Sequence, residues 1–154
     1  MDVTFTRTGE RRYAVGVERD GAPPLEMHPA PGYDPLIPHD LVHLAVELEC
    51  GIANGVFGQV AAGGHAGTFR PADGSVDRRL RQRGERLVRA HGADLARSER
   101  LTFAVTMSWR RGERPAADRE VERACGRLDR LSETWRALAV GETMRVPWAP
   151  QARS

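Results

Sequence analysis

The chain has 154 residues, of which 40% are hydrophobic and 29% charged, a composition typical of a globular protein. All 23 basic residues are arginine, which excludes chemistry that needs a lysine, such as a Schiff base or a phosphate-binding P-loop. No stretch approaches the roughly 20 apolar residues of a membrane-spanning helix, and the first residues lack the pattern of a signal peptide. We therefore expect a cytoplasmic protein that does not enter a membrane, with Cys50 and Cys125 as reduced thiols.

The N-terminal residues predict a β-hairpin. Residues 3–6 and 13–17 each alternate apolar and polar side chains, and a turn at residues 8–10 separates the two runs. Six prolines follow within residues 22–38, too many for a regular helix or a central strand. We expect this segment to be an ordered loop or an arm that wraps around the domain.

Two helices are expected next along the chain. The first covers residues 38–50, because proline is favoured in the first turn of a helix and Gly51 provides a stop. The second is a short helix over the apolar residues 56–62, after which two consecutive glycines mark a loop.

The second half of the chain is predicted to be mainly helical. An arginine-rich helix covers residues 76–91. Residues 98–111 alternate as a strand would, but their arginine-rich flanks and the glycine that follows favour a helix capped by Ser98. Apolar residues recur every three or four positions over 115–140, which is typical of an amphipathic helix, and residues 142–148 predict a short strand.

These elements predict an α+β fold. A small antiparallel sheet, made of the N-terminal hairpin and the C-terminal strand, is expected to pack against four or five helices. We expect one globular domain over residues 1–150 and a C-terminal tail at residues 151–154. The long helix at 115–140 is equally compatible with an intramolecular core and with a homodimer interface.

The helix at residues 38–50 concentrates the side chains that are suited to chemistry. His39, His43 and Glu47 recur every fourth residue and share one helix face, with Asp40 at its edge. Two histidines at this spacing bring their ring nitrogens within reach of one metal ion. We therefore expect zinc or another divalent metal with His39, His43 and Glu47 as ligands. Asp40 and Glu47 are the candidates for moving a proton in hydrolytic or lyase chemistry.

The run His39-Asp40-x-x-His43 resembles two known patterns. It is similar to the His-Glu-x-x-His helix of zincin metallopeptidases, which implies zinc ligation by both histidines, with Asp40 where zincins have a glutamate. It also resembles a family of ubiquinone-biosynthesis proteins whose His-Asp-x-x-His pair is completed by a glutamate on the next helix, where this chain has Gln59. The layout of the whole chain resembles bacterial proteins with a His-Asp-Leu-x-His-x-x-x-Glu helix, which implies no activity.

The alternative is that this stripe is the ordinary solvated face of a helix. Asp40 in the first turn is explained by the helix dipole alone, and Glu47 would then be a solvated acid. Against this alternative, a chain with 23 arginines places none of them on this face. If a metal binds, His65 and Asp34 are further candidate ligands, and His28 is a weaker one.

The arginine-rich helix is a second candidate for function. Residues 70–136 carry 17 arginines against 11 acids, whereas residues 1–69 carry 4 arginines against 9 acids. Such a basic helix predicts, as an alternative to an enzyme, a non-catalytic protein that binds an acidic protein or a nucleic acid. The helix has no aromatic residue for stacking on bases. Its arginines are Arg78, Arg79, Arg81, Arg83, Arg86 and Arg89.

Overall fold

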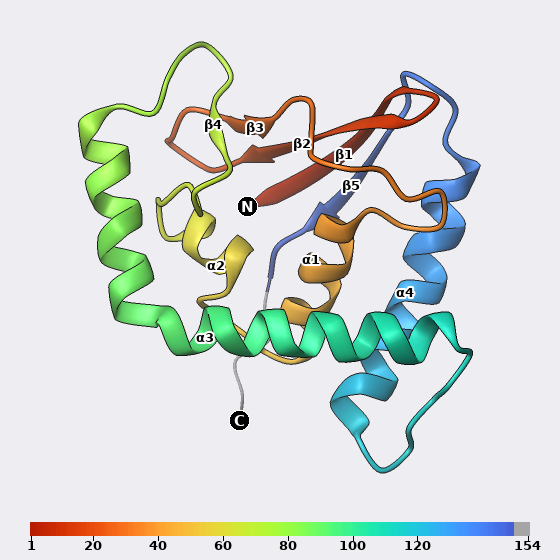
Figure 1. The fold of residues 1–154 in the computed structure, drawn as a ribbon. Helices are drawn as coiled ribbons and strands as arrows, with labels where there is room; N and C mark the ends of the chain where they lie inside the picture. Colours follow the sequence, from red (N-terminus) through yellow and green to blue (C-terminus); the bar gives the residue numbers. More distant parts are fainter. Residues whose placement is uncertain (150–154) are drawn as a thin grey trace.

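A computed structural model describes residues 1–149, which form a five-stranded antiparallel sheet and four helices (Figure 1). This arrangement confirms the predicted α+β class. The predicted tail at 151–154 lies outside the described residues. In chain order the elements are β1 (Asp2–Gly9), β2 (Arg12–Glu18), β3 (Leu25–Met27), α1 (His39–Glu49), α2 (Val56–Ala61), β4 (Arg70–Pro71), α3 (Arg78–Arg110), α4 (Arg119–Ala137) and β5 (Thr143–Pro147).

The strands follow the order β4-β3-β2-β1-β5 across the sheet. The hairpin β1–β2 and the addition of β5 to it were both predicted, and the structure pairs β5 with β1. Val3 pairs with Val17 on one side and with Val146 on the other, and all three side chains are buried. Because alternate residues of a strand face the same side, this register gives the sheet one continuous apolar face.

The proline-rich segment contributes more to the sheet than its composition indicates. The prediction of a loop or arm over residues 22–38 is wrong for β3, which lies between β2 and β4. The three residues of β3 contain no proline, so no backbone donor is lost from the ladder. Leu25 and Met27 are buried by this pairing.

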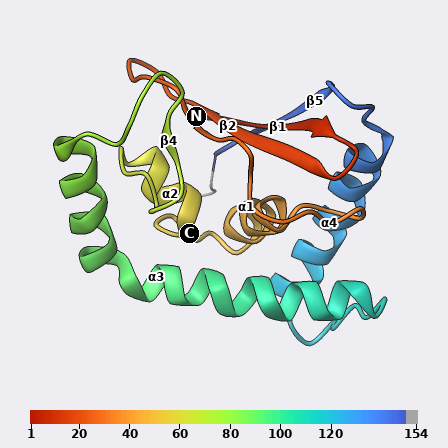
Figure 2. The same ribbon diagram turned by 45° about the horizontal axis from the view of Figure 1, so that its top comes forward.

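Helix α1 lies at the centre of the molecule, between the sheet and α3 (Figure 2). Its residues from Leu41 to Leu48 are all buried, including two polar ones. A helix that is buried all round belongs to the core rather than to the surface. The alternative of an ordinary solvated face therefore fails for His43 and Glu47, which are 4% and 0% exposed.

Helix α3 spans the two segments that were predicted as separate helices. Most of the predicted ranges 76–91 and 98–111 is helical, from Arg78 to Arg110, but the chain continues through them with only a local departure from helical geometry at His91 (φ −126°, ψ 27°). Asp77 caps the helix by accepting a hydrogen bond from the Leu80 amide at 2.7 Å. Ser98 is therefore an interior residue and not the predicted cap. It faces α1, and this orientation gives it a different role.

Helix α4 follows the predicted amphipathic stripe, which buries Val121, Cys125, Leu128 and Trp135. Across the described part of the chain, no helix combines the length and the apolar character needed to cross a bilayer.

Candidate functional site

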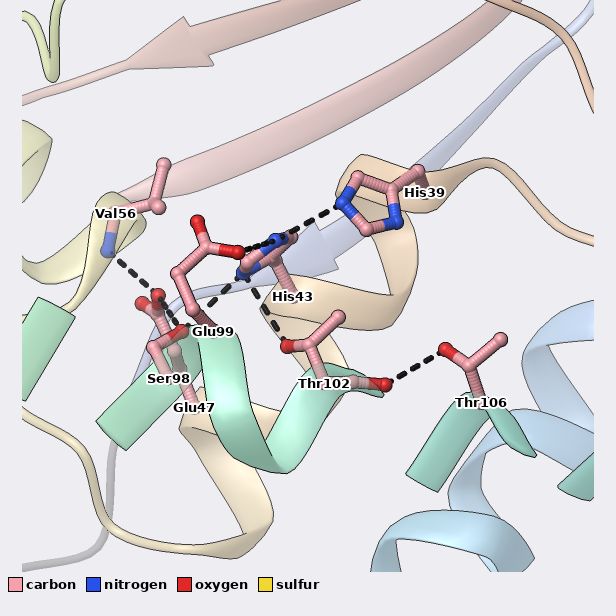
Figure 3. A network of polar contacts seen from close by, with 8 residues as sticks. All are labelled: His39, His43, Glu47, Val56, Ser98, Glu99, Thr102 and Thr106. Carbon is pink, nitrogen blue, oxygen red and sulfur yellow. Dashed lines mark hydrogen bonds and ion pairs between the residues drawn. The ribbon is translucent and has the colours of Figure 1, made fainter. Parts of the chain in front are cut away.

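The structure brings His39 and His43 together at the N-terminal end of α1 (Figure 3). Their Nε2 atoms lie 3.1 Å apart, and the two rings are nearly perpendicular. His39 is exposed, whereas His43 is 4% exposed. The pair thus joins a solvent-facing imidazole to one that the core holds in place.

Helix α3 fixes the inner ring nitrogen of His43. The Nδ1 atom lies 3.2 Å from the Ser98 hydroxyl and 3.3 Å from the Thr102 hydroxyl, and both residues are buried. Ser98 donates its single hydroxyl proton to Glu47 at 2.9 Å, so its oxygen accepts the Nδ1–H of His43. The network assigns the proton of neutral His43 to Nδ1 and leaves the Nε2 lone pair directed at His39.

Glu47 is engaged in the core and not at the histidine pair. Its carboxylate accepts hydrogen bonds from the backbone amides of Val56 at 2.5 Å and Phe57 at 3.0 Å. These amides belong to the first turn of α2, which has no other side-chain cap. Glu47 therefore caps α2 from a neighbouring helix and is linked to His43 through Ser98.

Burial shifts both ionisable groups of this network toward their neutral forms. It raises the pKa of Glu47 to about 7, although hydrogen bonds from Ser98 and from the α2 amides act in the opposite direction. Burial and the nearby His39 lower the pKa of His43 to about 4, against a smaller opposite effect of Asp40. His43 is consequently neutral at pH 7, with a free lone pair on Nε2.

Glu99 is the functional candidate that sequence reasoning missed. Its Oε2 lies 3.7 Å from His43 Nε2, and its side chain is 64% exposed. Because His43 is neutral at pH 7, this contact is not an ion pair under those conditions. The spacing of Ser98, Thr102 and Val105 marks the buried face of α3, but this pattern does not single out the exposed Glu99.

The other predicted residues make their own contacts elsewhere, although the charge of Asp40 still acts on His43. Asp40 accepts a hydrogen bond from the Tyr13 hydroxyl at 2.6 Å, which links α1 to β2 and contributes to the raised pKa of Tyr13 after burial. Asp34 forms an ion pair with Arg110. The ring of His65 packs on the backbone of α3 at Gly84. The last predicted candidate, His28, is exposed beside β3.

The arginine-rich part of α3 lies on the far side of the kink at His91 from Ser98. Arg83 donates from Nε to the Ala62 carbonyl at 3.0 Å, and Arg81 donates to the Val76 carbonyl. The guanidinium groups of Arg79 and Arg86 have no hydrogen bond or ion pair within residues 1–149. These two guanidinium groups are available for an external anion.

No group of three His, Cys, Asp or Glu side chains within residues 1–149 is arranged as a ready metal site. The histidine pair is thus a two-ligand arrangement, and the predicted ligand set of His39, His43 and Glu47 is not assembled by these rotamers. Comparison with protein-family models, with curated proteins and with solved structures gives no match for the chain.

Proposed function

We propose that this protein binds a divalent metal ion, such as zinc, between His39 and His43, and that the ion serves hydrolytic or lyase chemistry. The observation that carries the proposal is the 3.1 Å distance between the two Nε2 atoms. Two imidazole nitrogens at about 2.0–2.1 Å from one zinc ion lie roughly 3.3–3.4 Å apart at the tetrahedral angle, slightly more than the observed distance. The histidine pair is therefore close to the separation that one shared ion requires, and a rotation of the exposed His39 ring would replace the hydrogen bond between the two nitrogens with the ion.

The surroundings of His43 support a ligand role. Metal-binding histidines usually donate their other ring N–H to an oxygen, which fixes the tautomer and the ring orientation. His43 has this arrangement, because its Nδ1 faces Ser98 and Thr102 and Ser98 is bonded to Glu47. A buried imidazole that stays neutral at pH 7 also has no proton to lose before it binds a metal.

Glu99 is proposed as the third protein ligand in place of Glu47. Its carboxylate lies on the Nε2 side of His43, and its exposed side chain has room to rotate toward the histidine pair. Glu47 is fully buried and its oxygens accept the α2 amides. We therefore assign Glu47 a positioning role through Ser98.

The chemistry that we propose is Lewis-acid catalysis, in which a bound divalent ion polarises a substrate oxygen or a water molecule. Exposed His39 and Glu99 leave this side of the pair open to solvent. Asp40, which is half-buried, is the remaining candidate for moving a proton. Ser98 is not a nucleophile in this scheme, because it is 0% exposed.

We also propose a cytoplasmic location, which two buried cysteine thiols support.

Elemental analysis of protein purified without a metal-affinity column tests the proposal. Wild type should retain a divalent ion at close to one per chain, and His39→Ala should lose it. Because His39 is exposed, this variant should fold normally. His28→Ala is the matched control, since it removes another exposed histidine away from the pair. A wild type that holds no metal even after incubation with zinc, manganese, nickel and iron(II) would refute the proposal.

A further inference from the structure

A concave site separate from the histidine pair lies between the sheet and the first half of α3. The cavity has a volume of about 440 Å³ and is lined by four arginines, Arg19, Arg79, Arg83 and Arg86, together with apolar side chains that include Leu25 and Leu80. This volume falls in the range of small-molecule sites. Figure 1 shows the segment involved, where the first half of α3 descends from the loop that follows β4.

Three of these arginines come from one face of α3. Arg79, Arg83 and Arg86 are spaced by four and three residues, so on a helix they fall within about 60° of one another. Arg78 and Arg89 belong to the same basic run but do not line the cavity. Only one face of the arginine-rich segment of α3 therefore borders the cavity, and the other arginines of that segment lie outside it.

The fourth arginine comes from the turn after β2. Arg19 donates to the Val60 carbonyl at 3.0 Å, while its buried Nε has no hydrogen-bond partner in the described part of the chain. Burial lowers its pKa, and the nearby charge of Arg83 lowers it further. Arg19 and Arg83 therefore repel one another across the cavity, a cost that a bound anion would remove.

The acidic lining does not balance this charge. Asp77 is the one acid among the described residues that line the cavity, and its carboxylate already caps α3 by accepting the Leu80 amide. Arg79 and Arg86 have no carboxylate partner within residues 1–149. Four cations against one engaged acid leave a net charge of +3 around an apolar floor.

From this arrangement we propose that the cavity bordered by Arg19, Arg79, Arg83 and Arg86 binds a small molecule with an oxyanion head, a phosphate or a carboxylate, on a compact apolar body. Guanidinium groups bind both oxyanions through paired hydrogen bonds. Leu25, Leu80 and the nearby prolines match the apolar body, which a nucleic-acid backbone lacks. The site lies across the kink from His39 and His43 and does not depend on a metal there.

Isothermal titration and thermal-shift measurements with defined probes test this inference. Phenyl phosphate and benzoate carry the two oxyanions on an apolar ring, and inorganic phosphate and phenol carry each part alone. Wild type should bind phenyl phosphate, benzoate or both saturably in the millimolar range or below, more tightly than either part alone. A comparison of the two binding constants identifies the preferred head group.

A pair of double variants makes the result specific to the cavity. Arg79→Gln/Arg86→Gln should weaken binding roughly tenfold or more, because it removes two cavity cations that stabilise no other residue. Arg78→Gln/Arg89→Gln removes the same charge from the same helix and should bind like wild type. Equal losses in both double variants, or no saturable binding of either ring-bearing probe, would overturn the proposal. A short single-stranded oligonucleotide that binds while the small probes do not would also overturn it, in favour of an open cationic surface.

Discussion

The carboxylate of Glu47 occupies the space that a side chain on Gly55 would need. A Cβ built at residue 55 would overlap both carboxylate oxygens. Gly55 directly precedes the first turn of α2, whose amides Glu47 accepts. The absence of a side chain at this position thus allows a core helix to cap its neighbour from the side.

Replacing Gly55 with alanine should therefore destabilise the protein, because the added methyl group displaces the cap. We expect a loss of about 1–3 kcal/mol in the free energy of unfolding, measured by urea denaturation. Gly126→Ala makes the same chemical change within α4, where a Cβ would meet nothing within 4 Å. That control should leave stability unchanged or raise it by up to about 1 kcal/mol. Equal effects at the two positions would contradict the capping role.

The lowered pKa of His43 predicts a pH dependence of stability in metal-free protein. The unfolded chain takes up a proton on this histidine below about pH 6.5, whereas the folded protein does so only near pH 4. Between these values the unfolded state binds more protons, so the His43 contribution falls as the pH falls. The advantage of wild type over His43→Asn should shrink by up to roughly 3 kcal/mol from pH 6.5 to pH 4.

The raised pKa of Glu47 has the opposite effect on the free energy of unfolding over a similar pH range. Its contribution to stability is present below about pH 4.5 and is lost as the pH rises through about 7. The free energy of unfolding of wild type therefore depends less on pH than the contribution of either residue alone. Comparing wild type with His43→Asn in EDTA removes the Glu47 contribution, since both proteins contain it. A difference in unfolding free energy that is constant from pH 4 to pH 6.5 would show that His43 has an ordinary pKa.

Ser98 should affect metal binding although it is not a proposed ligand. Ser98→Ala removes the acceptor of the His43 Nδ1–H and breaks the link to Glu47. We expect zinc affinity to fall by about tenfold, as is typical when a residue that orients a metal-binding histidine is lost. Ser132→Ala is the control, because it deletes another buried serine hydroxyl, which donates to the Leu36 carbonyl at 2.7 Å. If both variants bind zinc equally well, Ser98 does not orient His43.

Glu99 and Glu47 can be separated in the same assay. Glu99→Gln should lower zinc affinity by about tenfold or more while leaving the melting temperature of metal-free protein nearly unchanged, because the side chain is mainly exposed. Glu133→Gln, a similar change at an exposed position of α4, should alter neither quantity. If the zinc affinity of Glu99→Gln equals that of wild type, Glu99 is not the third protein ligand.

Local patterns were sufficient to predict most of the fold. The alternation in β1 and β2, the apolar spacing of α4 and the glycine after α1 all indicate structure within a short window of sequence. β3 and β4 have three and two residues, and such strands exist only through their pairing with distant neighbours. The continuation of α3 past His91 depends likewise on packing against α1 and α2.

The candidate site was predictable only within α1. Helical spacing alone brings His39 and His43 to one face, and the structure places them together. The same spacing put Glu47 on that face. Its carboxylate instead binds the first turn of α2, because the chain turns back after α1, and helical spacing within α1 gives no information about that turn. Ser98 and Glu99 are more than 50 residues away in sequence, so their contacts with His43 required the tertiary arrangement.

Calorimetric titration of metal-free protein with zinc is the most direct test of a metal site at the histidine pair. Wild type and His28→Ala should each bind one ion per chain with the same affinity. His39→Ala should lose at least about tenfold in affinity, because one of the two nitrogens that lie 3.1 Å apart is removed. Saturable binding that is identical in wild type and His39→Ala, or no saturable binding by wild type, would contradict a metal site at the histidine pair.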